Sequence, residues 1–96
     1  MMKTNNYNPQ PVETDNIILP KELEELVEIL AKNTHDIWAL SRIRQGWSYG
    51  ENRDDIRKKH PCLVDYEDLD DSDKEYDRNT SIGTLKLILK MGFEIK

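Results

Sequence analysis

The chain has 96 residues, a formal net charge of −5 and one cysteine, with 36% hydrophobic and 34% charged residues. A single cysteine excludes an intramolecular disulfide, no apolar run approaches the roughly 20 residues of a membrane-spanning helix, and the acidic balance argues against general nucleic-acid binding. We therefore expect one cytoplasmic domain that binds neither nucleic acid nor membrane.

The N-terminal segment is polar and rich in asparagine and proline. Residues 1–12 lack the apolar stretch of a secretory signal, and we predict that they are flexible, with the folded domain spanning residues 13–96. Residues 16–20 (NIILP) predict a short extended lead-in, because the apolar run ends at a proline that suits the first turn of a helix.

The sequence from about residue 20 to 45 predicts the first of two principal helices. Glutamates fill its first turns and arginines its last, and Gly46 suits the position that ends it. The pair Asn33–Thr34 leaves open a break into two helices. Apolar spacing of three and four residues predicts one core-facing side. This side consists of Leu23, Leu26, Val27, Leu30, Ile37 and Ser41.

Residues 46–71 have no sustained period, which predicts a long irregular loop with one short helix near residues 66–69. A capping box at Ser72–Glu75 then predicts the second principal helix, over about residues 72–91 and ending at Gly92. Its core-facing side consists of Ile82, Leu85, Ile88 and Leu89.

Two details of the second helix stand out. Gly83 costs stability inside a helix, so either another chain passes close to it or the helix breaks near Asn79. After the helix, Phe93 and Ile95 suit a short terminal strand beside residues 17–19. The fold class is therefore mainly α: two principal helices joined by a long irregular loop, with short extended terminal segments.

Trp38 lies at the border of the predicted apolar side of the first helix. His35 precedes it by one turn and Arg42 follows by one turn, so the ring has a potential hydrogen-bond donor on each side. Two interpretations remain open. Trp38 is either a platform for a flat polar ligand or a boundary tryptophan that packs its body and keeps its N–H at the surface.

The other aromatic and basic candidates are also ambiguous. Trp47 and Tyr49 lie in a bend between two glycines, where they either wall a pocket or plug the bend onto the helices. Arg78 continues the apolar side of the second helix. It can snorkel to solvent, pair with a carboxylate such as Asp36 or Asp77, or hold a phosphate with two hydrogen bonds.

No motif for catalysis or metal binding is present. His60 and Cys62 follow Asp54 and Asp55 in the sequence, but their spacing matches no known metal site. No serine, cysteine or carboxylate pair has a motif for nucleophilic or general acid–base chemistry. We therefore expect a protein that is not an enzyme and that uses no metal and no cofactor.

Six short motifs occur in a fixed order along the chain. They are HDIW at 35–38, RIRQGWSYG at 42–50, HPCLV at 60–64, YEDL at 66–69, EYDR at 75–78 and MGF at 91–93. Together they closely resemble the ryanodine-receptor repeat, or RyR domain, in the single-copy form carried by bacteria and phages. The resemblance covers about residues 7–96. It departs from the family pattern at Asp65, often proline, and at Phe93, often tyrosine.

The resemblance implies a binding or sensing module for a small molecule, because some family members are understood to bind nucleotides with adenine stacked on tryptophan. Trp38 would stack the base, and the arginines would meet phosphate or ribose. The residues expected around such a ligand are His35, Trp38, Arg42, Trp47, Tyr49, Arg53 and Arg78. The alternative is a structural protein–protein interaction module, in which the same residues are interface anchors.

The resemblance also predicts a twofold homodimer. Repeats of this family pack in tandem pairs in the giant calcium-release channels, so a lone copy would leave the same face uncovered. A domain of this size has a marginal core and gains from burying more apolar surface. Gly83 and the exposed flank of the second helix are the predicted contact.

Overall fold

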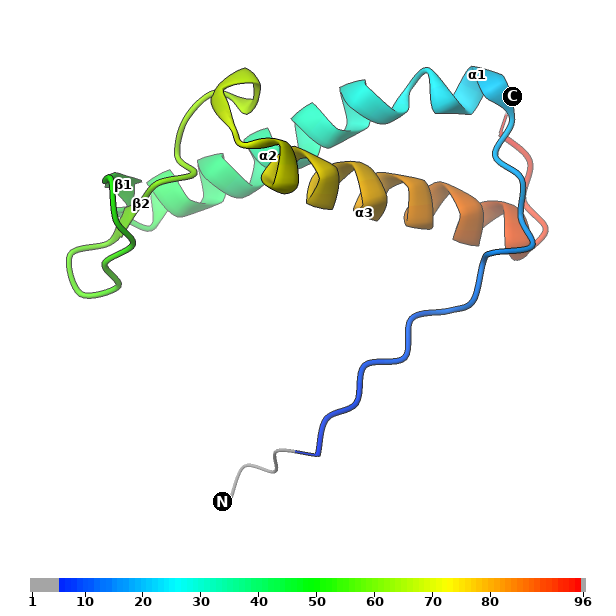
Figure 1. Ribbon diagram of the computed structural model, residues 1–96, viewed down its shortest axis with the longest axis horizontal. Coiled ribbons are helices and arrows are strands. Elements are labelled where there is room, and N and C mark those ends of the chain that lie inside the picture. Colours follow the sequence, from blue (N-terminus) through cyan, green and yellow to red (C-terminus); the bar gives the residue numbers. More distant parts are fainter. Residues whose placement is uncertain (1–5, 96) are drawn as a thin grey trace.

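The computed structural model describes residues 6–95 and is mainly helical (Figure 1). Its elements are α1 (Lys21–Glu24), α2 (Val27–Arg44), β1 (Ser48–Tyr49), β2 (Lys59–His60), the 3-10 helix η1 (Tyr66–Asp68) and α3 (Asp71–Lys90). The predicted fold class is confirmed, and so is the short helix in the loop. The predicted flexible segment lies partly outside the described residues. Residues 6–12 are exposed and belong to no helix or strand.

The first principal helix is interrupted, but not at Asn33–Thr34. α1 and α2 are separated by a tight turn in which the N–H of Leu26 donates to the carbonyl of Leu23 at 3.0 Å. At the predicted break the helix continues, and the hydroxyl of Thr34 donates to the carbonyl of Leu30 at 2.9 Å, a bond that a helix accommodates.

The start of α3 differs from the predicted capping box. Asp70 is the N-cap residue, and its backbone carbonyl accepts the N–H groups of Asp73 and Lys74 at 3.1 and 3.0 Å. The segment Ser72–Glu75 therefore lies inside the first turn, and no side chain caps this helix. The capping-box prediction is wrong because the N-cap residue is Asp70, two residues before Ser72.

Glycines end both long helices as predicted. Gly46 and Gly92 each have a φ of 93°, the left-handed conformation that commonly follows a helix. The predicted break near Asn79 is wrong, because α3 runs without interruption to Lys90. Around Gly83 there is open space: a Cβ atom placed there would have no neighbouring atom within 4 Å.

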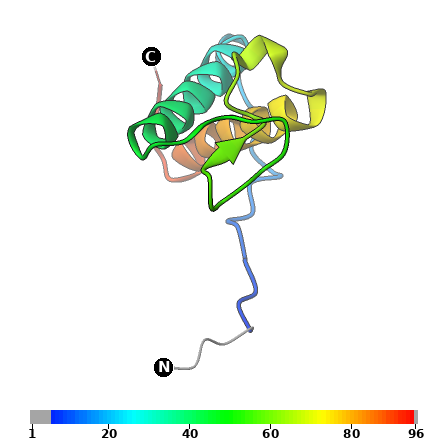
Figure 2. The same ribbon diagram turned by 90° about the vertical axis from the view of Figure 1, so that its left-hand side faces the viewer.

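α2 and α3 run antiparallel and side by side in both views (Figures 1 and 2). Two small apolar clusters join them to the rest of the chain. One cluster contains buried Leu19, Leu23 and Leu85, with Val27, Leu30, Ile82 and Leu89 packed against them. The other cluster contains buried Ala31, Tyr66 and Leu69, with Cys62 and Val64 packed against them. This second cluster fixes the loop and η1 on α2.

The packed side of α2 is only partly the predicted one. Ala31 and His35 are buried, whereas Leu26, Ile37 and Ser41 are exposed. α2 has apolar residues on two opposite sides, so spacing alone could not show which side faces the chain's own core. Trp38, which follows His35 by three residues, consequently lies on the packed side rather than at its border.

The connection between the long helices contains a minimal sheet. β1 and β2 are parallel, with Ser48 opposite Lys59 and Tyr49 opposite His60. The predicted strand at residues 93 and 95 is wrong: neither it nor residues 17–19 are in a strand. A hydrogen bond from the Lys90 ammonium to the backbone carbonyl of Glu13 joins these ends instead. Within residues 6–95 no helix combines the length and apolar character needed to cross a membrane.

Candidate functional site

A pocket of about 180 Å³ lies between α2, the loop that precedes η1, and the first turns of α3. Its lining residues are His35, Trp38, His60, Cys62, Leu69, Asp73, Tyr76 and Asp77. A cavity of about 150 Å³ is known to hold one benzene ring, so this pocket has the size of a single flat ring system.

Four aromatic side chains lie in or directly beside one wall of the pocket. The rings of Trp38 and His60 meet edge to face, with centroids 5.0 Å apart. His35 lies 5.7 Å from Trp38, and Trp47 lies 6.3 Å from His60. Because each ring contacts the next, the loop that carries His60 and Trp47 is packed onto α2 at this point.

His35 fixes the loop from within α2. It is buried, and its Nε2–H donates to the backbone carbonyl of Val64 at 2.7 Å. A carbonyl oxygen can only accept, so Nε2 must carry the proton. This bond holds the loop against α2 beside the pocket.

His60 is arranged differently. Its Nδ1 accepts the backbone N–H of Cys62 at 3.0 Å, which leaves the proton on Nε2 when the ring is neutral. Burial lowers the pKa of His60, and the positive charges of Arg53 and Arg42 lower it further. His60 therefore adds a neutral ring with one N–H donor to the pocket lining.

The α3 side of the pocket is acidic. Asp73 and Asp77 lie one turn apart, and burial raises the pKa of Asp77. The thiol of Cys62 lies 3.6 Å from Oδ2 of Asp73, and burial together with that carboxylate raises the pKa of Cys62. This side of the pocket therefore offers hydrogen-bond acceptors and negative charge.

A positive charge lies beside the pocket, next to the ring of Trp38 that lines it. The guanidinium of Arg42 lies 5.3 Å from the ring centre of Trp47 and 6.0 Å from that of Trp38. Such contacts are attractive because the face of an indole ring is negative.

Five of the seven predicted ligand residues lie outside the pocket lining. Arg42 and Trp47 lie beside it, whereas Tyr49, Arg53 and Arg78 lie elsewhere. Tyr49 is more than half exposed and lines a separate open hollow in the loop, together with Arg53 and Asp55. The guanidinium of Arg53 is paired with the carboxylate of Asp55, with Nε 2.8 Å from Oδ1.

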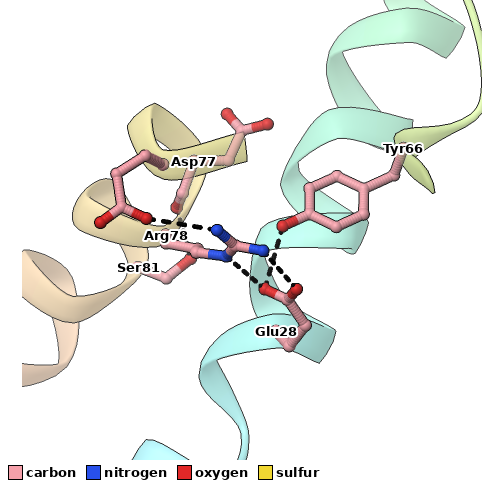
Figure 3. A network of polar contacts seen from close by, with 6 residues as sticks. Glu28, Tyr66, Asp77, Arg78 and Ser81 are labelled. Atoms are coloured by element: carbon pink, nitrogen blue, oxygen red, sulfur yellow. Dashed lines mark hydrogen bonds and ion pairs between the residues drawn. The ribbon is translucent and has the colours of Figure 1, made fainter. Parts of the chain in front are cut away.

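Arg78 belongs to a polar network on another part of the surface (Figure 3). Its Nε and Nη2 each donate to the carboxylate of Glu28 at 2.7 Å, and its Nη1 lies 3.3 Å from Glu75. The hydroxyl of Tyr66 donates to the same Glu28 carboxylate at 3.0 Å. Hydrogen bonds from Arg78 lower the pKa of Glu28 to about 2. The alternative that Arg78 pairs with a carboxylate is confirmed. Its partners are Glu75, one turn before it on α3, and Glu28, at the start of α2, instead of Asp36 or Asp77.

The sequence model of the RyR domain family matches residues 7–96 of this chain. The chain belongs to the RyR domain family. The match includes both long helices, the loop between them and every residue that lines the pocket, so the predicted resemblance is confirmed.

In this RyR domain, four of the seven predicted site residues form one cluster. They are His35, Trp38, Arg42 and Trp47. The prediction missed His60 and Cys62 as lining residues, and it missed the α3 side entirely. The sequence did contain a signal for a polar wall on this side. Asp73 and Asp77 lie four residues apart on the predicted helix and therefore on one face of it. Among residues 6–95, no three histidine, cysteine or acidic side chains are grouped to hold a metal ion.

Proposed function

We propose that this RyR domain is a non-enzymatic binding or sensing module for a small nucleotide-like ligand whose base enters the pocket beside Trp38. The observation that carries the proposal is the polarity of the site. Carboxylates line its α3 side, and the guanidinium of Arg42 lies at its edge beside the rings of Trp38 and Trp47. A nucleotide has the complementary polarity, with N–H donors on its base and negative charge on its phosphate.

The size of the pocket supports entry of the base alone. Sites that enclose whole drug-sized ligands have volumes of about 300–1,000 Å³, and this pocket has about 180 Å³. The ribose and phosphate would therefore remain outside the pocket. Contact between the base and the indole of Trp38 would supply about 1–3 kcal/mol, the range measured for stacking of nucleic-acid bases on aromatic side chains.

The polar groups favour a base with an amino group beside a ring nitrogen. The carboxylates of Asp73 and Asp77 can accept hydrogen bonds from an amino group, whereas a carbonyl at the same position would face them unfavourably. The Nε2–H of His60 can donate to a ring nitrogen. An adenine-type base has this pattern, and a hypoxanthine-type base carries a carbonyl in place of the amino group.

Arg42 is the best placed residue for the phosphate. It contacts two tryptophan rings, and among the described side chains its guanidinium forms no ion pair. Arg53 would have to exchange Asp55 for the ligand, and Arg78 is already held by Glu28. Of the three arginines expected to contact phosphate or ribose, Arg42 is therefore the one that we propose for the phosphate.

A thermal-shift panel tests this proposal with matched ligands. AMP at 100 times its dissociation constant should stabilise the domain by about 2.7 kcal/mol, a clear rise in melting temperature at this size. IMP, which carries a carbonyl in place of the amino group of AMP, should give a much smaller rise. Adenosine should also give a smaller rise than AMP, because it lacks the phosphate and its contact. If no nucleotide or nucleoside raises the melting temperature at millimolar concentration, the proposal is wrong.

Two variants locate the ligand. Asp77→Asn should weaken AMP more than IMP, because an amide can donate a hydrogen bond to the IMP carbonyl. Tyr49→Ala is the matched control, since Tyr49 lies outside the pocket lining and should leave the AMP response unchanged. AMP binding that depends on Tyr49 and ignores Asp77 would place the ligand in the loop hollow instead.

A further inference from the structure

α2 has a second apolar side that the chain itself does not cover. Its five members are all isoleucine or leucine, yet they are between 42% and 65% exposed. Four of them lie within the 18 residues of α2, and the fifth directly precedes it. They are Leu26, Ile29, Ile37, Leu40 and Ile43. On a helical wheel this side lies roughly opposite Ala31 and Trp38, which face the rest of the chain. The exposed polar residues Asn33 and Asp36 lie among them. An exposed apolar side of this extent is typical of an interaction surface.

The spacing of four of these residues is symmetric about Asn33, whereas Ile43 corresponds to Leu23, which is buried in the chain's own core. Ile29 and Ile37 lie four residues before and after it, and Leu26 and Leu40 lie seven before and after it. An antiparallel copy of the helix, related by a twofold axis through Asn33, therefore places isoleucine opposite isoleucine and leucine opposite leucine. This self-complementarity is the requirement for a twofold interface, in which the same patch serves both copies.

The charges at the two ends follow the same symmetry. Exposed Glu22, Glu24 and Glu25 precede α2, and exposed Arg44 is its last residue. In an antiparallel pair each acidic end meets the basic end of the partner, and the two helix dipoles also oppose one another. A parallel pair would instead bring like charges together. Charge and apolar spacing thus select the same arrangement.

We infer that a second copy of this chain covers the exposed side of α2, through an antiparallel helix pair centred on Asn33. The flank of α3 predicted for this role is less suitable. Its exposed residues are polar apart from Tyr76, so it has little apolar area to bury. The inference does not depend on the ligand proposal, because the pocket lies on the other side of α2.

The size of the surface predicts a reversible dimer. A helix of 18 residues is about 27 Å long and about 10–12 Å wide, so one face presents roughly 300 Å² per copy. Stable interfaces bury about 800 Å² per partner. Association much weaker than that of a stable dimer is therefore expected, with monomer and dimer exchanging as concentration changes.

Sedimentation velocity across micromolar to millimolar concentration tests the inference. The protein should shift from a monomer of 11.3 kDa toward twice that mass as concentration rises. Ile37→Glu should abolish the shift, because it places two carboxylates, one from each copy, in the apolar interface without a compensating positive charge. Ile56→Glu is the control. Because Ile56 is 95% exposed in the loop, this variant should dimerise as the parent does. A monomer at every concentration, or a dimer unaffected by Ile37→Glu, overturns the inference.

Disulfide trapping tests the register. Helix axes about 8–10 Å apart, with Cα atoms on a radius of about 2.3 Å, leave facing Cα atoms roughly 3–5 Å apart, close to the spacing that a disulfide requires. Asn33→Cys should therefore form a covalent dimer on mild oxidation, whereas the parent, with Cys62 alone, should not. Arg44→Glu should weaken the dimer, and adding Glu22→Arg should restore it. Trapping at Ile56→Cys as fast as at Asn33→Cys would contradict this register.

Discussion

Replacing His35 by leucine tests how the pocket is assembled. The substitution removes the donor that holds the Val64 carbonyl at 2.7 Å, and it leaves that oxygen without its partner in a partly buried position. An unsatisfied buried polar group costs about 1–3 kcal/mol. In a domain of this size each kcal/mol lowers the melting temperature by about 4–8 °C, so we expect a fall of roughly 4–24 °C.

Thermal unfolding followed by circular dichroism measures this effect, and His35→Gln is the matched variant. A glutamine amide can still donate to the Val64 carbonyl, so His35→Gln should lose less stability than His35→Leu. Amide exchange of residues 62–69 should accelerate in the leucine variant, because the loop and η1 lose their hold on α2. If His35→Leu melts within a degree of the parent and exchange is unchanged, the loop is not held by His35.

Three further predictions concern stability and reactivity. Gly83→Ala should stabilise the domain by about 1 kcal/mol, because the added methyl group enters open space inside a helix, whereas Gly50→Ala should destabilise it, since its Cβ would lie 2.5 Å from a neighbouring side-chain carbon. Chemical denaturation of the two variants measures both changes. Bonding to Arg78 lowers the pKa of Glu28 from 4.5 to about 2, so the stability from this pair is complete above about pH 4.5 and is lost as pH falls toward 2. Glu28→Gln should flatten the acid limb of the melting temperature, and an unchanged limb would show that the pair contributes nothing. The raised pKa of Cys62 should make its alkylation by iodoacetamide at neutral pH slower than that of free cysteine, and equal rates would contradict it.

Much of the fold follows from local signals in the sequence. Gly46 and Gly92 end the two long helices at the predicted positions, because only a residue without a side chain readily adopts a φ of 93°. The loop and its short helix were also predicted, since residues 46–71 have no helical period. These features depend on a few neighbouring residues and need no knowledge of the tertiary structure.

The packed side of α2 could not be predicted in the same way. Ile37 and Ala31 are both apolar and both inside α2, yet Ala31 is buried and Ile37 is 63% exposed. Only the position of η1, which places Tyr66 and Leu69 against Ala31, selects one side. That contact joins residues more than thirty positions apart, and no local period encodes it.

The candidate site was likewise only partly predictable from local sequence signals. The cluster of Trp38 with Arg42 was visible from helical spacing, because one turn separates them. His60 and Asp73 were not, since the loop and α3 bring them to Trp38 from distant parts of the chain. Arg78 was expected at the ligand, but its position opposite Glu28 depends on how α2 and α3 pack.

Calorimetric titration of AMP into the parent protein and into Trp38→Ala tests the proposed function most directly. Loss of base stacking should weaken binding by about 1–3 kcal/mol, which is roughly 5- to 150-fold in dissociation constant. Circular dichroism should show that the variant remains folded, and Trp38→Phe, which keeps an aromatic ring, should recover part of the affinity. If AMP does not bind the parent, or binds the folded Trp38→Ala variant as tightly as the parent, the pocket beside Trp38 is not a nucleotide site.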